Sequence, residues 1–150
     1  MGRDWTIDTN VLYVAAELDM DAVEFLMLIR REKDIITLDF EGHIEGEYQN
    51  CFASIRSSRK PGGEFVKKWF KIIVAKGVQK FSGRLPAKGR HQLRKLRFDQ
   101  SDWPFVAVCA QTESKCLVSE DSDYTDAIKQ FLGEDMKVAV LRIRDSLNLT

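Results

Sequence analysis

Short apolar runs, each followed by acidic turn residues and then by a helical pattern, constrain the fold of this chain most. The run at 5–7 leads into Asp8, a β-branched run covers 34–38, and the run at 116–118 ends in an acidic segment. Strands that alternate with helices predict a mainly parallel sheet with helices on both faces. For 150 residues, the prediction is one α/β domain, a three-layer α/β/α sandwich.

The helical segments are predicted from apolar spacing, from caps and from breakers. Asp21 is expected to cap the second helix, and Gly77 to end the fourth. The segment 78–89, with its glycines and a proline, is expected to be the least regular part. The expected helices cover 11–16, 21–29, 44–55, 65–76, 91–96, 102–109 and 125–132, and a last strand covers 137–143.

Composition excludes several classes of protein. No segment approaches the roughly 20 apolar residues of a membrane span, and the N-terminus shows no apolar signal region. Three cysteines without a close pair, and two distant histidines, argue against a disulfide framework and against a zinc site. We therefore expect a reduced, cytoplasmic protein that does not enter a membrane.

Positive charge is concentrated in the segment 76–97, which we interpret as a basic, insertion-like part of the domain. It holds eight of the 23 basic residues and no acid, so the rest of the chain carries 15 basic residues against 23 acidic ones. Such a segment beside an acidic cluster suits a polyanionic ligand. A solvated, mobile loop is the alternative interpretation. The residues expected to contact phosphates are Lys88, Arg90, Arg94, Lys95 and Arg97.

Acidic residues stand where several of these strands end or helices begin. Asp8 follows the first strand, Asp102 opens a helix, and Asp121 and Asp123 follow the strand at 116–118. The carboxyl ends of parallel strands form the ligand-binding edge of an α/β sheet, and hard divalent cations prefer oxygen ligands. Joint placement of these acids therefore predicts a metal site.

Each acid also has a simpler interpretation when it is taken alone. Asp8 and Asp102 could serve only as helix caps, because Asp is among the best N-cap residues. The acidic segment 119–123 could be an ordinary polar loop. Within the third helix, Glu47 could lie on a solvated face, and Glu45 competes with it for any role in the site.

Three sequence motifs resemble those of the PIN-domain nucleases. Residues 7–12, Ile-Asp-Thr-Asn-Val-Leu, match the opening motif of that family. The helix that begins at Asp102 is similar to the family's Asp-led helix, with Cys109 in place of a usual small residue. The segment 117–124 resembles its apolar-apolar-Thr-x-Asp-x-Asp-aromatic motif, with Ser for Thr. Glu47 fits best the family's acidic position in the helix after the second strand.

The resemblance implies a metal-dependent endoribonuclease with Mg²⁺ or Mn²⁺ in an acidic pocket. Its expected catalytic and metal-binding residues are Asp8, Glu47, Asp102 and Asp121, with Asp123 as a further metal acid. The residues expected to orient these ligands by hydrogen bonds are Thr9, Asn10 and Ser119. Many small members are toxins that an antitoxin protein neutralises, so an antitoxin and a homodimer are implied partners. The extra segment 59–97 departs from the commonest toxins.

Three other kinds of protein share some of these features. A catalytically inactive module of the same fold, which binds RNA or protein, would lack the acids that are present here. An aspartate-based phosphatase needs a second Asp two residues after the first, where this chain has Asn10. A nucleotide-binding Rossmann protein is disfavoured because no Gly-x-Gly-x-x-Gly follows the first strand.

Overall fold

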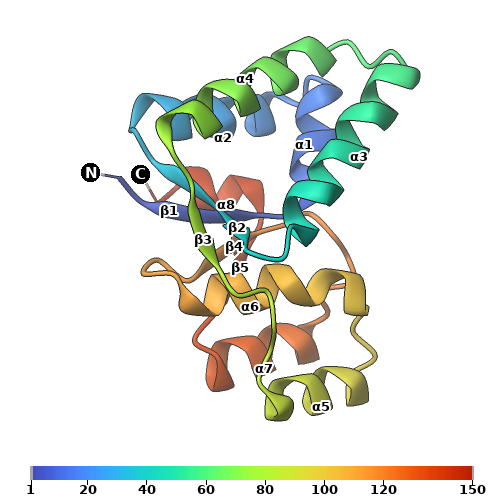
Figure 1. Ribbon diagram of the computed structural model, residues 1–150, viewed down its shortest axis with the longest axis vertical. Coiled ribbons are helices and arrows are strands. Elements are labelled where there is room, and N and C mark those ends of the chain that lie inside the picture. The colour runs from blue at the N-terminus through green and yellow to red at the C-terminus, as the bar shows by residue number, and fades with distance from the viewer. Residues whose placement is uncertain (1, 150) are drawn as a thin grey trace.

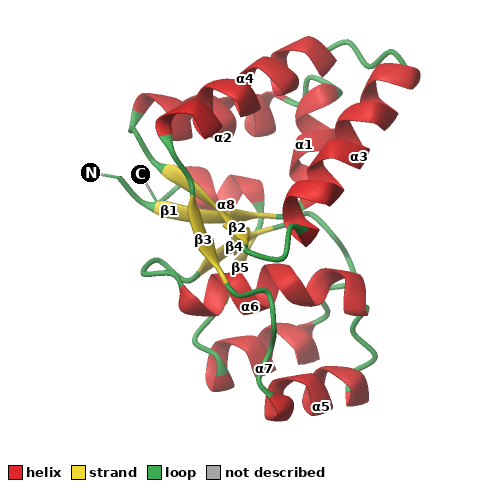
Figure 2. Ribbon diagram, in the orientation of Figure 1, coloured by secondary structure: helices red, strands yellow, loops and turns green. Residues whose placement is uncertain are grey.

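The computed structural model describes residues 2–149, in which five parallel strands form a central sheet (Figures 1 and 2). Their order across the sheet is β3-β2-β1-β4-β5. The central strands are buried apolar runs, as expected for a sheet that is covered on both faces. The strands are β1 (Asp4–Ile7), β2 (Ile35–Asp39), β3 (Gln79–Phe81), β4 (Cys116–Val118) and β5 (Ala139–Leu141).

Helices cover both faces of this sheet, which gives the predicted three-layer α/β/α sandwich. Helices α1 to α4 lie on one side, and α5, α6 and α7 lie on the other (Figure 1). Helix α8 packs against α2. The helices are α1 (Thr9–Ala16), α2 (Met20–Arg31), α3 (His43–Ser57), α4 (Gly63–Lys76), α5 (Ala87–Lys95), the 3₁₀ helix η1 (Gln100–Asp102), α6 (Trp103–Gln111), α7 (Asp126–Asp135) and α8 (Ile143–Leu147).

Two buried tryptophans tie the helices on the first side to the sheet and to each other. The indole nitrogen of Trp5, on β1, donates to Asp34 at 2.8 Å, and its ring meets Phe25 of α2 edge-on. Trp69, on α4, donates to the carbonyl of Leu26 in α2 at 2.7 Å. A buried indole needs such a partner, so these bonds fix how α2 and α4 pack.

The register of the sheet determines which residues lie together at its carboxyl edge. Trp5 pairs with Ile36, and the hydroxyls of Thr6 and Thr37 share a 2.8 Å hydrogen bond. On the other side of β1, Ile7 pairs with Val118 of β4. The residues that follow these two strands therefore emerge side by side.

The structure corrects the predicted start of the second helix. Asp19 caps α2 by accepting a 3.0 Å hydrogen bond from the backbone N–H of Ala22, whereas Asp21 lies in the first turn. The turn before it places Leu18 at a φ of 63°. By contrast, Gly77 ends α4 as predicted, at a φ of 109° that favours glycine.

Two short elements differ from the sequence-based expectation. The segment expected to be irregular contains β3, whose three residues pair with 37–39 of β2. The last expected strand, 137–143, is only three residues of β5, after which α8 begins at Ile143. Elements this short hold too few residues for a hydrophobic period to show. Within residues 2–149, no helix combines the length and apolarity needed to cross a bilayer.

Candidate metal centre

The predicted acids surround the carboxyl ends of β1 and β4. These two strands are neighbours in the sheet, and the chain continues from β1 toward β2 and from β4 toward β5. Such a reversal of strand order opens a crevice at the carboxyl edge, where α/β proteins bind ligands. Asp8 directly follows β1, and Asp121 lies three residues beyond the end of β4.

Asp8 is the most deeply buried acid of this group, at 4% exposed. One carboxylate oxygen accepts from the backbone N–H of Thr9 at 2.7 Å, and the other accepts from the Ser119 hydroxyl at 2.7 Å. The pKa of Asp8 is raised to about 6, mainly by burial. The negative charges of Asp121 and Glu47 also raise this pKa, and the two hydrogen bonds lower it. Asp8 thus caps α1 and also faces other carboxylates.

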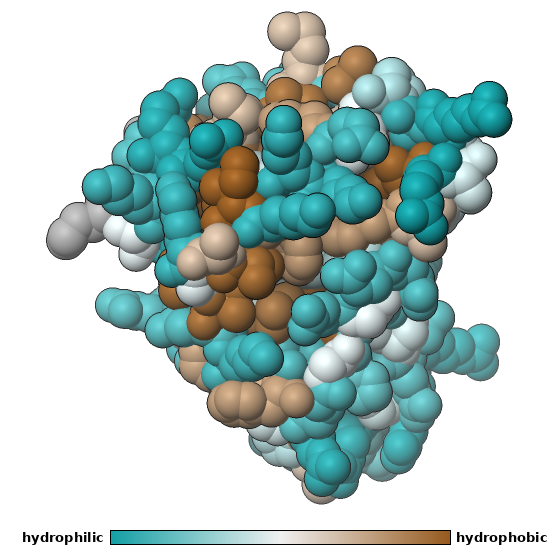
Figure 3. All heavy atoms as spheres, turned by 45° about the horizontal axis from the view of Figure 1, so that its top comes forward, coloured by the Kyte–Doolittle hydropathy of each residue, from teal (hydrophilic) through white to brown (hydrophobic). Residues whose placement is uncertain are grey.

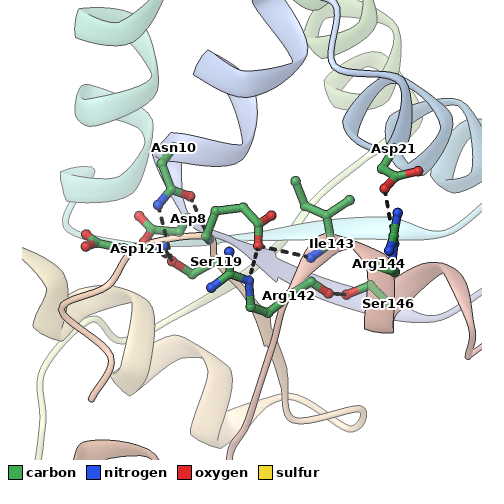
Figure 4. Close-up of polar contacts among 10 residues, drawn as sticks. Asp8, Asn10, Asp21, Ser119, Asp121, Arg142, Ile143, Arg144 and Ser146 are labelled. Atoms are coloured by element: carbon green, nitrogen blue, oxygen red, sulfur yellow. Dashed lines mark hydrogen bonds and ion pairs between the residues drawn. The ribbon is translucent and has the colours of Figure 1, made fainter. Parts of the chain in front are cut away.

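The Ser119 hydroxyl links the two strand ends (Figure 4). It donates to Asp8 and accepts from the backbone N–H of Asp121 at 3.0 Å and from the Asn10 amide at 3.4 Å. The amide oxygen of Asn10 accepts in turn from the N–H of Glu120 at 3.2 Å. Asn10 and Ser119, which were predicted as supporting residues, therefore fix the acidic loop after β4 against the start of α1.

Glu47 reaches the same crevice from α3. Its carboxylate accepts a 3.1 Å hydrogen bond from the Thr9 hydroxyl, so Thr9 also supports a predicted ligand. Burial raises the pKa of Glu47, and the charge of Asp99 adds to this, whereas His43 lowers it. Glu45 is exposed and, within residues 2–149, makes no side-chain hydrogen bond or ion pair with the site, so Glu47 is the glutamate that the structure places there.

The start of α3, which positions Glu47, is fixed by a buried cap. The two carboxylate oxygens of Asp39 accept from the N–H groups of His43, at 3.0 Å, and Ile44, at 2.8 Å. Gly42 takes the left-handed conformation that this turn requires, at a φ of 83°. In addition, Tyr48 donates its hydroxyl to the carbonyl of Ile7 at the end of β1.

Asp102 stands at the N-cap position of α6, but its side chain makes no capping hydrogen bond to that helix. Asp99 accepts from the N–H of Ser101 at 2.9 Å and caps the preceding 3₁₀ helix. Burial raises the pKa of Asp102 to about 7, and the charges of Asp8, Glu47, Asp121 and Asp99 add to the effect of burial. The carboxyl group of Asp102 therefore lies among other acids.

Three of the acids come close enough together to share one cation. Asp102, Asp121 and Asp123 each offer a carboxylate oxygen, and these oxygens lie within 4.8 Å of one another. Asp123 is the exposed member, and its N–H donates to Asp121 at 2.9 Å. Asp8 and Glu47 are outside this group, but their negative charges raise the pKa of Asp102. They therefore lie next to the same centre.

The surroundings of this cluster suit a hard divalent cation. All donors are carboxylate oxygens, and no basic side chain is among the causes that shift the pKa of Asp8 or of Asp102. Buried carboxylates without a counter-charge are costly, and a bound cation removes that cost. Mg²⁺ or Mn²⁺ therefore fits the donor set.

Tyr124 adds an unpartnered polar atom beside these acids. Within residues 2–149, its hydroxyl is the one buried side-chain nitrogen or oxygen without a hydrogen-bond partner. Burial raises the pKa of Tyr124, and the charges of Asp8, Asp102 and Asp121 raise it further. A phenol that is 3% exposed and lies near three carboxylates has a free donor for a molecule bound at the site.

The structure does not bring the predicted phosphate-binding residues into contact with this centre. Arg94, on α5, places its guanidinium 5.4 Å from the centre of the Trp103 ring. Lys88 lines a hollow between α5 and α7. Arg90, Lys95 and Arg97 are exposed, and within residues 2–149 they form no ion pair with the acids.

Two residues of the site were missed at the sequence level. Asp99 raises the pKa of both Glu47 and Asp102. His43 lowers the pKa of Glu47, and it stands four residues before Glu47 on the same helix, a spacing that brings side chains together. In the sequence, the spacing of His43 and Glu47 and the Asp99-x-Ser101 turn pattern could have indicated these two residues.

Comparisons with known proteins identify no relative of this chain. No family model, no curated protein and no solved structure matches it. A functional assignment therefore depends on the geometry and the chemistry of the site itself.

Proposed function

We propose that this protein is a divalent-metal-dependent endoribonuclease of the PIN type. In this proposal Asp8, Glu47, Asp102 and Asp121 bind Mg²⁺ or Mn²⁺, and Asp123 adds a ligand at the solvent-facing side. The substrate is RNA, and the reaction is hydrolysis of a phosphodiester bond by water.

One observation carries the proposal. Asp102, Asp121 and Asp123 place carboxylate oxygens within 4.8 Å of one another near the strand-order reversal of the sheet, and Asp8 and Glu47 are near enough to raise the pKa of Asp102. Asp8 accepts two 2.7 Å hydrogen bonds and its pKa is still raised, so these bonds do not compensate for its burial. Acids that raise one another's pKa values in a crevice are typical of a functional site.

The residues around the acids have distinct parts in this chemistry. Asp8 and Asp121 are held by Ser119, and Glu47 by Thr9, so the oxygen donors are in place before a cation arrives. When bound, the cation activates the attacking water and neutralises the charge that develops on the phosphate. The free hydroxyl of Tyr124 can donate to a phosphate oxygen or to a water in the site.

RNA is the proposed substrate because the chain concentrates positive charge in and around α5, in a segment without acids. Arg94 stands over the Trp103 ring, and α5 carries further basic residues. Phosphates need cationic contacts at the edge of such a site, since the acids themselves repel a polyanion. These contacts predict that RNA binding weakens as salt increases.

Cleavage of labelled single-stranded RNA tests the proposal directly. We expect cleavage with Mg²⁺ or Mn²⁺, none with EDTA, and none with Asp8→Asn under any of these conditions. Equal cleavage by the wild type and by Asp8→Asn would trace the activity to a contaminant and overturn the proposal. Binding of RNA by both proteins, with cleavage by neither, would favour the inactive RNA-binding module instead.

A further inference from the structure

A groove between α3 and α4 lies outside the acidic centre and has no part in the proposed reaction. It encloses about 440 Å³. Its floor contains Phe52 and Phe70, whose ring centres are 5.2 Å apart, together with Ile55 and Ala53. On this side of the molecule, Figure 3 shows hydrophobic side chains lying between hydrophilic ones.

The rim of this groove is strongly basic. Five cationic side chains line it, against the single acid Glu64. Within residues 2–149, only one of the five forms an ion pair, a 3.7 Å contact of Lys60 with Glu17. The cations of the rim are Arg56, Arg59, Lys60, Lys67 and Lys71.

We propose that the α3–α4 groove is a docking site for an acidic amphipathic helix of another protein. The apolar floor fits the hydrophobic stripe of such a helix, and the unpaired cations fit acids on its two flanks. From Gln49 to Arg56 the groove follows α3 for about 10 Å, the length of a helix of roughly seven residues. This inference does not depend on the nuclease proposal.

A second copy of this chain is a poor occupant. A two-fold interface would place the same groove on both subunits, so the five cations of one rim would face the five cations of the other. Like charges at that distance repel and are costly when water is excluded. The partner must therefore supply negative charge.

The negative charge of a nucleic acid would also match the basic rim, but the floor of the groove does not suit the stacking of bases. Binding of single strands depends on the open faces of aromatic rings, on which bases stack. Phe70 is only 6% exposed, and its ring packs at a 54° tilt against that of Phe52. The rings therefore line an apolar trough and offer no flat stacking platform.

A designed peptide tests this assignment. The probe is a fluorescein-labelled helical peptide of about 14 residues, with leucines at i, i+4 and i+7 and glutamates on both flanks. Fluorescence anisotropy should show binding that weakens with salt. A peptide with lysine in place of every glutamate should not bind, and a single-stranded RNA of similar length serves as the competing ligand.

Matched variants separate the charge of the rim from the shape of the groove. Lys67→Glu with Lys71→Glu should weaken peptide binding at least about tenfold, whereas Lys68→Glu with Lys76→Glu, on α4 but outside the groove, should not. Ala53→Arg fills the groove while it adds positive charge, so it should also weaken binding. None of these changes should alter RNA cleavage.

Four outcomes would overturn the proposal. The first is absence of peptide binding to a wild type that is folded by circular dichroism. The second is stronger peptide binding by Ala53→Arg, because charge alone would then explain the attraction. The third is that the groove variants weaken RNA binding and leave peptide binding unchanged. The fourth is that Ala53→Arg dissociates a dimer in sedimentation.

Discussion

Buried aspartates stand at both ends of the sheet, and the two ends treat them in opposite ways. At the amino edge, the carboxylate of Asp4 accepts from the N–H groups of Ser114, at 2.8 Å, and Glu113, at 3.0 Å. Burial works to raise the pKa of Asp4, but these hydrogen bonds outweigh it and hold the pKa below its ordinary value. Asp34, nearby, accepts from Arg3 and from the Trp5 indole.

At the carboxyl edge, Asp8 is buried and Asp102 is partly buried, and the groups that face them differ. Asp8 and Asp102 face other carboxylates, and the pKa values of both are raised, to about 6 and about 7. The comparison shows that burial alone does not mark a functional acid. An acid whose oxygens are satisfied by backbone donors supports the fold, whereas acids that face one another require something that the chain does not supply.

The largest expected difference between the two edges is in catalysis. Asp8→Asn should lower the rate of RNA cleavage roughly a thousandfold, about 4 kcal/mol, because a ligand of the cation is lost. Asp4→Asn, at the opposite edge, should cleave at the wild-type rate under conditions where it is folded. Initial rates with saturating Mg²⁺ measure both. Loss of cleavage in both variants would show that the edges do not differ in this way.

Stability should respond in the opposite order. Asp4→Asn exchanges an acceptor of two backbone N–H groups for an amide with one acceptor, and should lower the free energy of unfolding by about 2–3 kcal/mol. Asp8→Asn removes a charge from a crowded site, and should raise that free energy by on the order of 1 kcal/mol near pH 8 without metal. Urea unfolding at that pH measures both, and a loss of stability in Asp8→Asn would contradict the comparison.

Divalent metal should stabilise the carboxyl edge only. At a hundredfold excess over its dissociation constant, Mg²⁺ should add about 2.7 kcal/mol to the free energy of unfolding. The gain should be larger near pH 8 than near pH 5, because protons compete with the cation for Asp8 and Asp102. Thermal unfolding with Mg²⁺ and with EDTA tests this, with Asp4→Glu as a control that should keep the gain. An equal gain in Asp8→Asn would place the cation elsewhere.

The metal-free protein should become less stable as pH rises from about 4 to about 7. Asp8 and Asp102 have folded-state pKa values above the ordinary 3.8, so in this window the folded protein binds more protons than the unfolded chain. Asp102→Asn should reduce the slope by about one proton at most. Urea midpoints across this pH range measure the slope, and a midpoint that rises with pH would oppose the assigned shifts.

The smallest effect is expected on the basic helix. Replacing Arg90, Arg94 and Lys95 by Ala should weaken RNA binding about tenfold at low salt and flatten its salt dependence. Lys129→Ala on α7 is a matched surface control. RNA affinity that is unchanged in the triple variant would defeat the assignment of α5 as a phosphate-binding element.

The sequence predicts the carboxyl edge better than it predicts the outer parts of the fold. The structure brings carboxylate oxygens of Asp102, Asp121 and Asp123 within 4.8 Å of one another, and Asp8 and Glu47 are near enough to raise the pKa of Asp102. Asp8 and Asp121 follow buried strands, and Glu47 lies on a long helix, so the sequence places these three unambiguously. Parallel strands then bring such residues to one edge whatever the connecting segments do.

Other features could not be predicted because they depend on distant partners. Strand β3 has only three residues and exists through its pairing with β2. Asp102 makes no capping hydrogen bond to α6. The capping hydrogen bond of this region is made by Asp99, at the start of the preceding 3₁₀ helix. The hydroxyl of Tyr124 lacks a hydrogen-bond partner because of how the loop after β4 packs in the folded protein, near Asp8 and Asp102 of other segments.

The reversal of strand order has a consequence for how this centre is assembled. Asp8 and Glu47 belong to the part of the chain before residue 98, and Asp102, Asp121 and Asp123 belong to the part after it. A chain divided there would separate Asp8 and Glu47 from the three acids whose oxygens lie within 4.8 Å of one another. The full set of proposed metal acids is therefore complete only when both parts of the chain are folded and joined.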